Sequence, residues 1–176
     1  MDKRKKVDTG AMQAGDIILF HGTSLVSRLI QFGANSFWNH GVLYVGEAWE
    51  RQFVIEAAFQ GVRVYPLQEY DRDKQLVLRP VEPVGASVVQ AGLKYLGRRY
   101  DFESYPALFL RVLRMRFPWL PYRVRGEPNP FFYCFELVAQ AYKDVGFPLT
   151  TWELVLPQYL IDAVAAGRLT VVSGGL

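Results

Sequence analysis

The chain has 176 residues, of which 51% are hydrophobic and 21% charged, the balance of an ordinary globular protein. This length suits one domain with a substantial hydrophobic core, so we expect disorder only near the ends. The single cysteine excludes an intrachain disulfide, and one Cys with two His falls short of a typical structural zinc site. The net charge of +3 is small, but the basic residues are unevenly spread along the chain.

Residues 1–13 are expected to form a flexible basic tail before a single domain over residues 14–176. Residues 1–6 are basic like the front of a signal peptide, but Val7-Asp8-Thr9-Gly10 is not an apolar stretch, so no secretion signal is predicted. No window of the sequence is long and apolar enough to span a bilayer. The expected location is therefore cytoplasmic.

Apolar runs and turn residues predict the elements in chain order. A short buried strand follows Gly15, and Ser24 is expected to cap a helix that Gly33 ends. Four strands come next, and the rest of the chain is mostly helical, apart from a proline-rich stretch and one last strand. The predicted strands are 16–20, 40–45, 52–58, 61–65, 75–81 and 169–172, and the predicted helices are 25–32, 87–96, 105–117, 132–145 and 157–166. This order predicts an α+β fold with helices packed on a mainly antiparallel sheet.

A histidine and a glutamate on neighbouring predicted strands form a candidate catalytic pair. If residues 46–50 make the hairpin loop, Val45 pairs with Arg51 and, further along, His40 lies opposite Glu56. Side chains in such positions share one face of the sheet, and a carboxylate there holds an imidazole in one tautomer and favours its protonated form. One β-bulge would change this register. The alternative is that Glu56 is an edge-strand charge facing solvent and His40 a structural histidine.

The single cysteine, Cys134, lies near the start of the predicted helix 132–145. Backbone N–H groups and the helix dipole at such a position favour a thiolate. Apolar residues follow it at helical spacing, namely Leu137, Val138, Ala141, Tyr142 and Val145. We expect this stripe to pack on the sheet that carries His40, which would bring the thiol to its base. The alternative is a small core residue, which a lone cysteine on an apolar face usually is.

His21 is the competing candidate base. It follows the first predicted strand and precedes Gly22, so it is expected in a loop. Because the predicted register places no acidic residue opposite His21, we prefer His40 as the base.

Five segments around these residues resemble a known family. They are Gly15-Asp16-Ile17-Ile18-Leu19-Phe20, Asn39-His40-Gly41-Val42-Leu43-Tyr44-Val45-Gly46, Val54-Ile55-Glu56-Ala57, Gly97-Arg98-Arg99-Tyr100-Asp101 and Tyr133-Cys134-Phe135-Glu136-Leu137-Val138. Together they resemble the permuted papain-like hydrolases, the YiiX-like relatives of the NlpC-type cell-wall peptidases. The family order is His, then a polar third member, then Cys at a helix start. The resemblance covers roughly residues 14 to 146, most of the chain.

The resemblance implies a permuted papain-like α+β fold, no cofactor, and a cysteine amidase or peptidase that forms an acyl-enzyme on an amide bond, such as one in a cell-wall peptide. Carried over by position, it makes Cys134 the nucleophile, His40 the base and Glu56 the third member. One position departs from the family, because the residue after the cysteine is commonly small and here is Phe135. The stretch 102–132 is a further place where substrate choice could be set.

A basic segment at 98–125 interleaves arginines with large apolar residues. This pattern is typical of an interfacial segment on an anionic membrane, and equally of a core-facing helix with a solvated arginine face. We favour the core-facing helix slightly. Three functions therefore stay open. They are an amidase or peptidase, which is preferred, a lipid-acting acyl hydrolase or acyltransferase with the same three residues, and a non-catalytic binding module. No nucleic-acid recognition motif is present, so nucleic acid is the weakest partner.

Overall fold

The computed structural model describes residues 9–58, 60–70, 74–98, 134–150 and 155–174. The helix expected over residues 105–117, the stretch 102–132 and nearly all of the basic segment 98–125 lie outside these ranges. Among the helices that are described, none combines the length and the hydrophobicity needed to cross a membrane.

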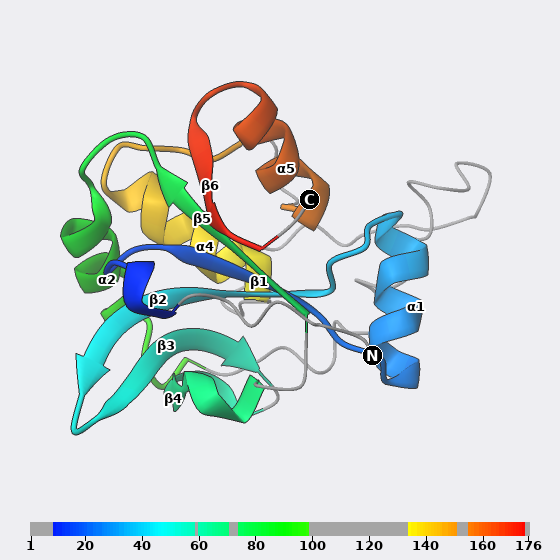
Figure 1. Cartoon of the computed structure of the whole chain (residues 1–176), viewed down its shortest axis with the longest axis horizontal. Helices are drawn as coiled ribbons and strands as arrows, with labels where there is room; N and C mark the ends of the chain where they lie inside the picture. The colour runs from blue at the N-terminus through cyan, green and yellow to red at the C-terminus, as the bar shows by residue number, and fades with distance from the viewer. Residues whose placement is uncertain (1–8, 59, 71–73, 99–133, 151–154, 175–176) are drawn as a thin grey trace.

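Six strands form one antiparallel sheet in the order β4-β3-β2-β1-β5-β6 (Figure 1). The strands are β1 (Ile17–His21), β2 (His40–Ala48), β3 (Arg51–Ala58), β4 (Gly61–Pro66), β5 (Lys74–Pro80) and β6 (Leu169–Ser173). Because β6 pairs with β5, strands from both ends of the chain meet in this sheet. The sheet confirms the predicted α+β fold with mainly antiparallel strands.

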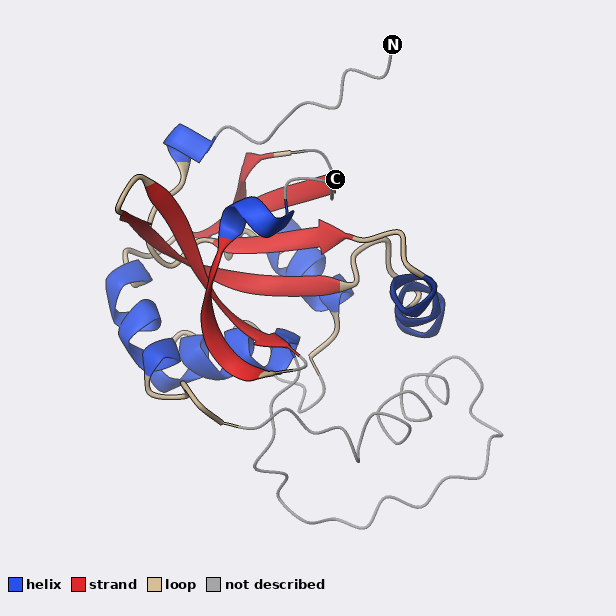
Figure 2. Cartoon of the chain, turned by 90° about the horizontal axis from the view of Figure 1, so that it is seen from below, coloured by secondary structure: helices blue, strands red, loops and turns tan. Residues whose placement is uncertain are grey.

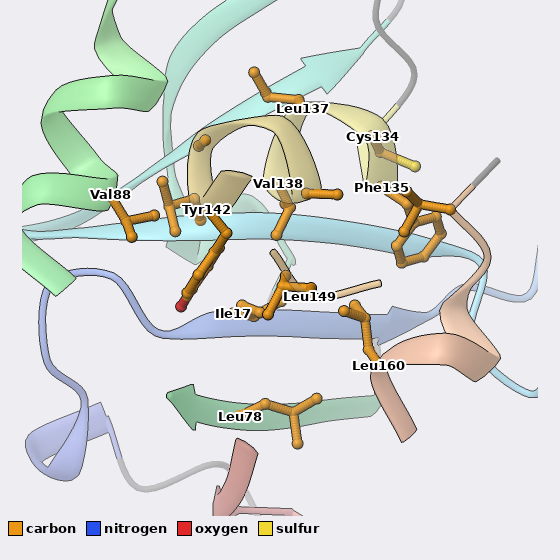
Figure 3. Packing of buried hydrophobic residues seen from close by; sticks show 14 of the residues in the cluster. Ile17, Leu78, Val88, Cys134, Phe135, Leu137, Val138, Tyr142, Leu149 and Leu160 are labelled. Carbon is orange, nitrogen blue, oxygen red and sulfur yellow. The ribbon is translucent and has the colours of Figure 1, made fainter. Parts of the chain in front are cut away.

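The described helices are α1 (Leu25–Ala34), α2 (Gly85–Leu93), α4 (Cys134–Asp144) and α5 (Pro157–Ala165), with the short 3-10 helices η1 (Thr9–Ala11) and η2 (Leu67–Tyr70). Helices α2, α4 and α5 pack on one face of the sheet, and Figure 3 shows Val138 and Tyr142 of α4 pointing toward the strands. Helix α1 stands apart, beyond the strand ends (Figure 1, Figure 2).

The two faces of the sheet carry separate apolar clusters. Ile17 and Leu19 of β1 join the larger cluster under α2, α4 and α5, whereas Ile18 and Phe20 join a smaller cluster on the other face, next to η2. This division follows from the two-residue period of side chains along a strand. All four of these side chains are buried, so β1 contributes to both clusters.

Residues 9–13 belong to the folded domain rather than to the tail expected over residues 1–13. Met12 is buried in the smaller cluster, and Arg79 donates a hydrogen bond to a backbone carbonyl of η1. The same guanidinium makes two hydrogen bonds, of 2.8 and 2.7 Å, to the buried carboxylate of Asp16. This long-range ion pair holds the segment before β1 against β5. No local pattern in the sequence predicts it.

The hairpin between β2 and β3 is tighter than the expected five-residue loop over residues 46–50. Ala48 pairs with Arg51, so the loop contains only Trp49 and Glu50, both of which have positive φ (50° and 60°). Two-residue loops with positive φ at both positions match the right-handed twist of the flanking strands. The usual residues at such positions are Asn, Asp or Gly. Trp49 and Glu50 are none of these, so the turn is not predicted from the sequence.

The direct pairing of His40 with Glu56 was also wrong. Leu43 pairs with Ile55, and a bulge follows Tyr44. Continued toward the start of β2, this register places Glu56 across from the residue two positions after His40. The two side chains are therefore diagonal neighbours on the same face of the sheet, a separation that long side chains can bridge.

The first turn of α4 packs against β2 at Gly41. A Cβ atom on Gly41 would lie 2.6 Å from Cε1 of Phe135, so only glycine leaves room for this ring. Figure 3 shows Phe135 pointing from the start of α4 toward the strands, with Cys134 beside it. Because Gly41 follows His40 in sequence and Phe135 follows Cys134, this contact brings the histidine and cysteine segments together.

We predict that Gly41→Ala lowers the free energy of unfolding by about 1–3 kcal/mol, because the added methyl group overpacks the contact with Phe135. Urea denaturation of the two proteins measures the difference. In a Phe135→Leu background, which lacks the Cε1 atom, the same substitution should cost clearly less. An equal cost in both backgrounds would mean that the ring is not what requires glycine.

Candidate active site

The carboxylate of Glu56 is the centre of a polar cluster at one end of the sheet. Its side chain has 0% exposure, and its Oε2 atom lies 3.2 Å from Nε2 of His40. The Tyr70 hydroxyl at the end of η2 donates a hydrogen bond to the same Oε2 atom. Arg63, directly across from Glu56 on β4, donates from Nε to Oε1 at 2.7 Å. A buried carboxylate requires such donors, because an unpaired buried charge costs several kcal/mol.

Opposing effects set the protonation of this carboxylate. Burial raises the pKa of Glu56, but hydrogen bonds from His40, Tyr70 and Arg63, together with the charge of His40, lower the pKa below its usual value. Burial and the negative charge of Glu56 in turn raise the pKa of Tyr70. Glu56 is therefore an ionised acceptor at neutral pH, and Tyr70 keeps the proton that it donates.

His40 lies at the start of β2, with its side chain 19% exposed. Burial lowers the pKa of His40, but hydrogen bonds and electrostatic interactions with Cys134 and Glu56 raise the pKa to about 10. Nε2 faces Glu56 and the Tyr70 hydroxyl, both at 3.2 Å. The other ring nitrogen, Nδ1, is thus the one left for the thiol, and the ring is an imidazolium at neutral pH.

Helix α4 is described from Cys134 onward, and residues 132 and 133 of the expected helix 132–145 lie outside the described part of the chain. Cys134 is a free cysteine, and 9% of it is exposed. Its thiol is a hydrogen-bond partner of the His40 side chain. The structure therefore brings together all three residues that the sequence singled out, in an arrangement suited to nucleophilic catalysis.

His21, the competing base, has other partners. Its Nδ1 atom lies 2.7 Å from the backbone carbonyl of Phe37 and 3.0 Å from Nε2 of Gln31. The His21 ring also stacks on the Phe37 ring, with centroids 3.8 Å apart. These contacts hold His21 against α1 and the loop after it, whereas His40 carries the contacts to Glu56 and Cys134.

The sequence interpretation missed Arg63 and Tyr70. The sequence does contain a pattern that predicts the position of Arg63. A tight turn between the strands predicted at 52–58 and 61–65 would pair Ala58 with Gly61. The same register places Arg63 opposite Glu56, as the structure shows. No pattern in the sequence predicts the position of Tyr70, because it reaches the carboxylate of Glu56 from the short 3-10 helix η2, whose direction depends on the tertiary fold.

Among solved structures, the chain resembles the crystal structure of the metalloprotein YiiX from Escherichia coli O157:H7. The TM-score is 0.67 and the identity 21%, over 93% of this chain and 97% of that chain. At this identity the likeness shows the fold, and it confirms the expected permuted papain-like, YiiX-like architecture.

The described side chains around His40 do not fit a metal site. No three or more His, Cys, Asp or Glu residues gather to hold an ion in the parts of the chain that the structure describes. Both oxygens of Glu56, the one buried acid beside His40, already accept hydrogen bonds from Arg63 and Tyr70. The positive charge of Arg63, whose Nε lies 2.7 Å from Oε1 of Glu56, would repel a metal cation bound to this carboxylate.

No curated protein sequence matches the chain. The family model described as "Permuted papain-like amidase enzyme, YaeF/YiiX, C92 family" matches residues 11–106, more than half of the chain. This region contains His40, Glu56, Arg63 and Tyr70, and it ends before Cys134. The chain therefore belongs to the permuted papain-like amidases of the YaeF/YiiX, C92 family.

Proposed function

We propose that the protein is a cysteine-dependent amidase or peptidase in which Cys134 is the nucleophile, His40 the base and Glu56 the residue that orients the base. The observation that carries this proposal is the position of His40, which has one ring nitrogen on a buried carboxylate and the other left for the thiol. Family membership supports amide hydrolysis as the reaction class. We expect a peptide or acyl amide as substrate, with cell-wall peptides tested first.

The reaction would begin from a Cys134 thiolate and a His40 imidazolium. The sulfur attacks the carbonyl carbon, and the oxyanion accepts a hydrogen bond from the backbone N–H of Cys134. His40 then protonates the leaving amine, so the C–N bond breaks and the acyl group stays on sulfur as a thioester. Neutral His40 next takes a proton from water, whose oxygen attacks the thioester, which releases the acid and restores the ion pair.

Glu56 acts in this scheme through His40 and makes no contact with the substrate. Its Oε2 atom holds the Nε2–H tautomer, so that Nδ1 is directed to the sulfur when the ring is neutral. Its negative charge also stabilises the imidazolium that forms with the thiolate. An acceptor other than water at the second step would make the same three residues an acyltransferase.

We predict that iodoacetamide alkylates Cys134 rapidly below the unperturbed thiol pKa of about 8.5, and that His40→Ala slows this reaction roughly 100-fold at pH 6.5, where an ordinary thiol is only about 1% ionised. Because Cys134 is the only cysteine, mass spectrometry follows it without ambiguity. His21→Ala is the matched control and should leave the rate unchanged. Slow alkylation that is equal in all three proteins would indicate a core cysteine and the binding-module function.

We also predict that the protein releases amines from peptide or acyl amides and that Cys134→Ala lowers the rate by at least about a thousandfold, as expected when a catalytic nucleophile is lost. Acid-quenched mass spectrometry should show an acyl adduct on Cys134. A panel of cell-wall peptides, simple acyl amides and lipid esters defines the substrate class. Turnover of lipid esters with none of the amides would contradict the amidase proposal and favour the lipid-acting alternative.

A further inference from the structure

The Glu56 carboxylate accepts hydrogen bonds from two side chains besides His40, which the orientation of a histidine alone would not require. Arg63 binds the oxygen that faces away from His40, and Tyr70 binds the oxygen that faces it. Both partners are themselves held in place. The guanidinium of Arg63 lies 3.8 Å from the ring centroid of Tyr65, and the ring of Tyr70 stacks on Phe20 at 4.3 Å. The carboxylate thus accepts hydrogen bonds at both oxygens from side chains that have ring contacts of their own.

We propose that Arg63 and Tyr70 are positioning residues for the reaction, which keep Glu56 ionised and directed at His40. This inference rests on the proposed function, because it concerns the same Cys134 and His40. Without these two donors, only His40 would oppose the effect of burial, which raises the pKa of Glu56 and so favours its protonated form. Its negative charge would then no longer stabilise the imidazolium beside the thiolate.

The charge of Arg63 and the hydroxyl of Tyr70 act on Glu56 in different ways. Arg63 carries a full positive charge and is 32% exposed, so its guanidinium reaches solvent while its Nε–H reaches the buried carboxylate. Tyr70 contributes a neutral O–H donor, but to the oxygen that His40 shares. Because exposure to solvent weakens the effect of the Arg63 charge, we expect the loss of Tyr70 to affect the ionisation of Glu56 at least as much as the loss of Arg63.

A purely structural role is the competing explanation, and the chain offers a matched control for it. Arg79 holds the buried carboxylate of Asp16 by two hydrogen bonds, between other strands of the same sheet. Asp16 is 1% exposed and Glu56 0%, so the two ion pairs have similar burial. Loss of either pair is expected to destabilise the fold, but only loss of Arg63 should alter the chemistry of Cys134.

The test is the pH profile of Cys134 alkylation by iodoacetamide in the full chain, with thermal unfolding of each variant measured alongside. In Arg63→Gln, the acid-side midpoint of the profile should move to higher pH by about one unit, since a carboxylate without its cation is protonated at higher pH. Tyr70→Phe should move it in the same direction by at least as much. Arg63→Lys should shift it less than Arg63→Gln does. Arg79→Gln should lower the unfolding temperature and leave the profile unchanged.

An unchanged profile in both Arg63→Gln and Tyr70→Phe, with the wild-type cysteine still activated by His40, would overturn this inference alone. An equal shift in Arg79→Gln would overturn it too, because the effect would then come from lost stability. Slow and His40-independent alkylation of the wild-type protein would instead contradict the proposed function. If Arg63→Gln does not fold, Arg63→Lys and Tyr70→Phe decide the outcome by the same criterion.

Discussion

The buried negative charge of Glu56 is the constraint on which the rest of the site depends. A carboxylate with no solvent exposure persists only if donors replace water, and here they come from His40 on β2, Arg63 on β4 and Tyr70 on η2. The requirement to satisfy one group therefore fixes three elements relative to β3. It also fixes the histidine ring, whose second nitrogen is then available to the cysteine at the start of α4.

A steric constraint complements this electrostatic one. The ring of Phe135 occupies the space that a side chain at position 41 would need, so a glycine next to His40 and an aromatic residue next to Cys134 are complementary. In the family that the sequence resembles, the residue after the cysteine is commonly small, and here it is Phe135. This contact accounts for the larger residue, because the ring points from α4 toward the strands beside Cys134 (Figure 3) and meets β2 at Gly41.

Most of the strands and helices could be predicted from the sequence, because apolar periodicity and β-propensity are local signals. The pairing of His40 with Glu56 was found through a wrong register, and it survived because both side chains still share one face of the sheet. The hairpin turn was missed since Trp49 and Glu50 are unusual residues for positive φ. The Asp16–Arg79 pair and the Tyr70 contact join positions far apart in sequence, which no local pattern reveals.

The central claim is that a buried carboxylate and a thiol together hold His40 protonated at neutral pH. Nitrogen-15 NMR of the imidazole rings against pH measures this directly, with His21→Ala used to assign the two histidines. The account predicts that both nitrogens of His40 carry protons from neutral pH to about pH 10, and that Glu56→Gln lowers this limit. A His40 ring that loses its proton near the unperturbed value of about 6.5 would contradict the account.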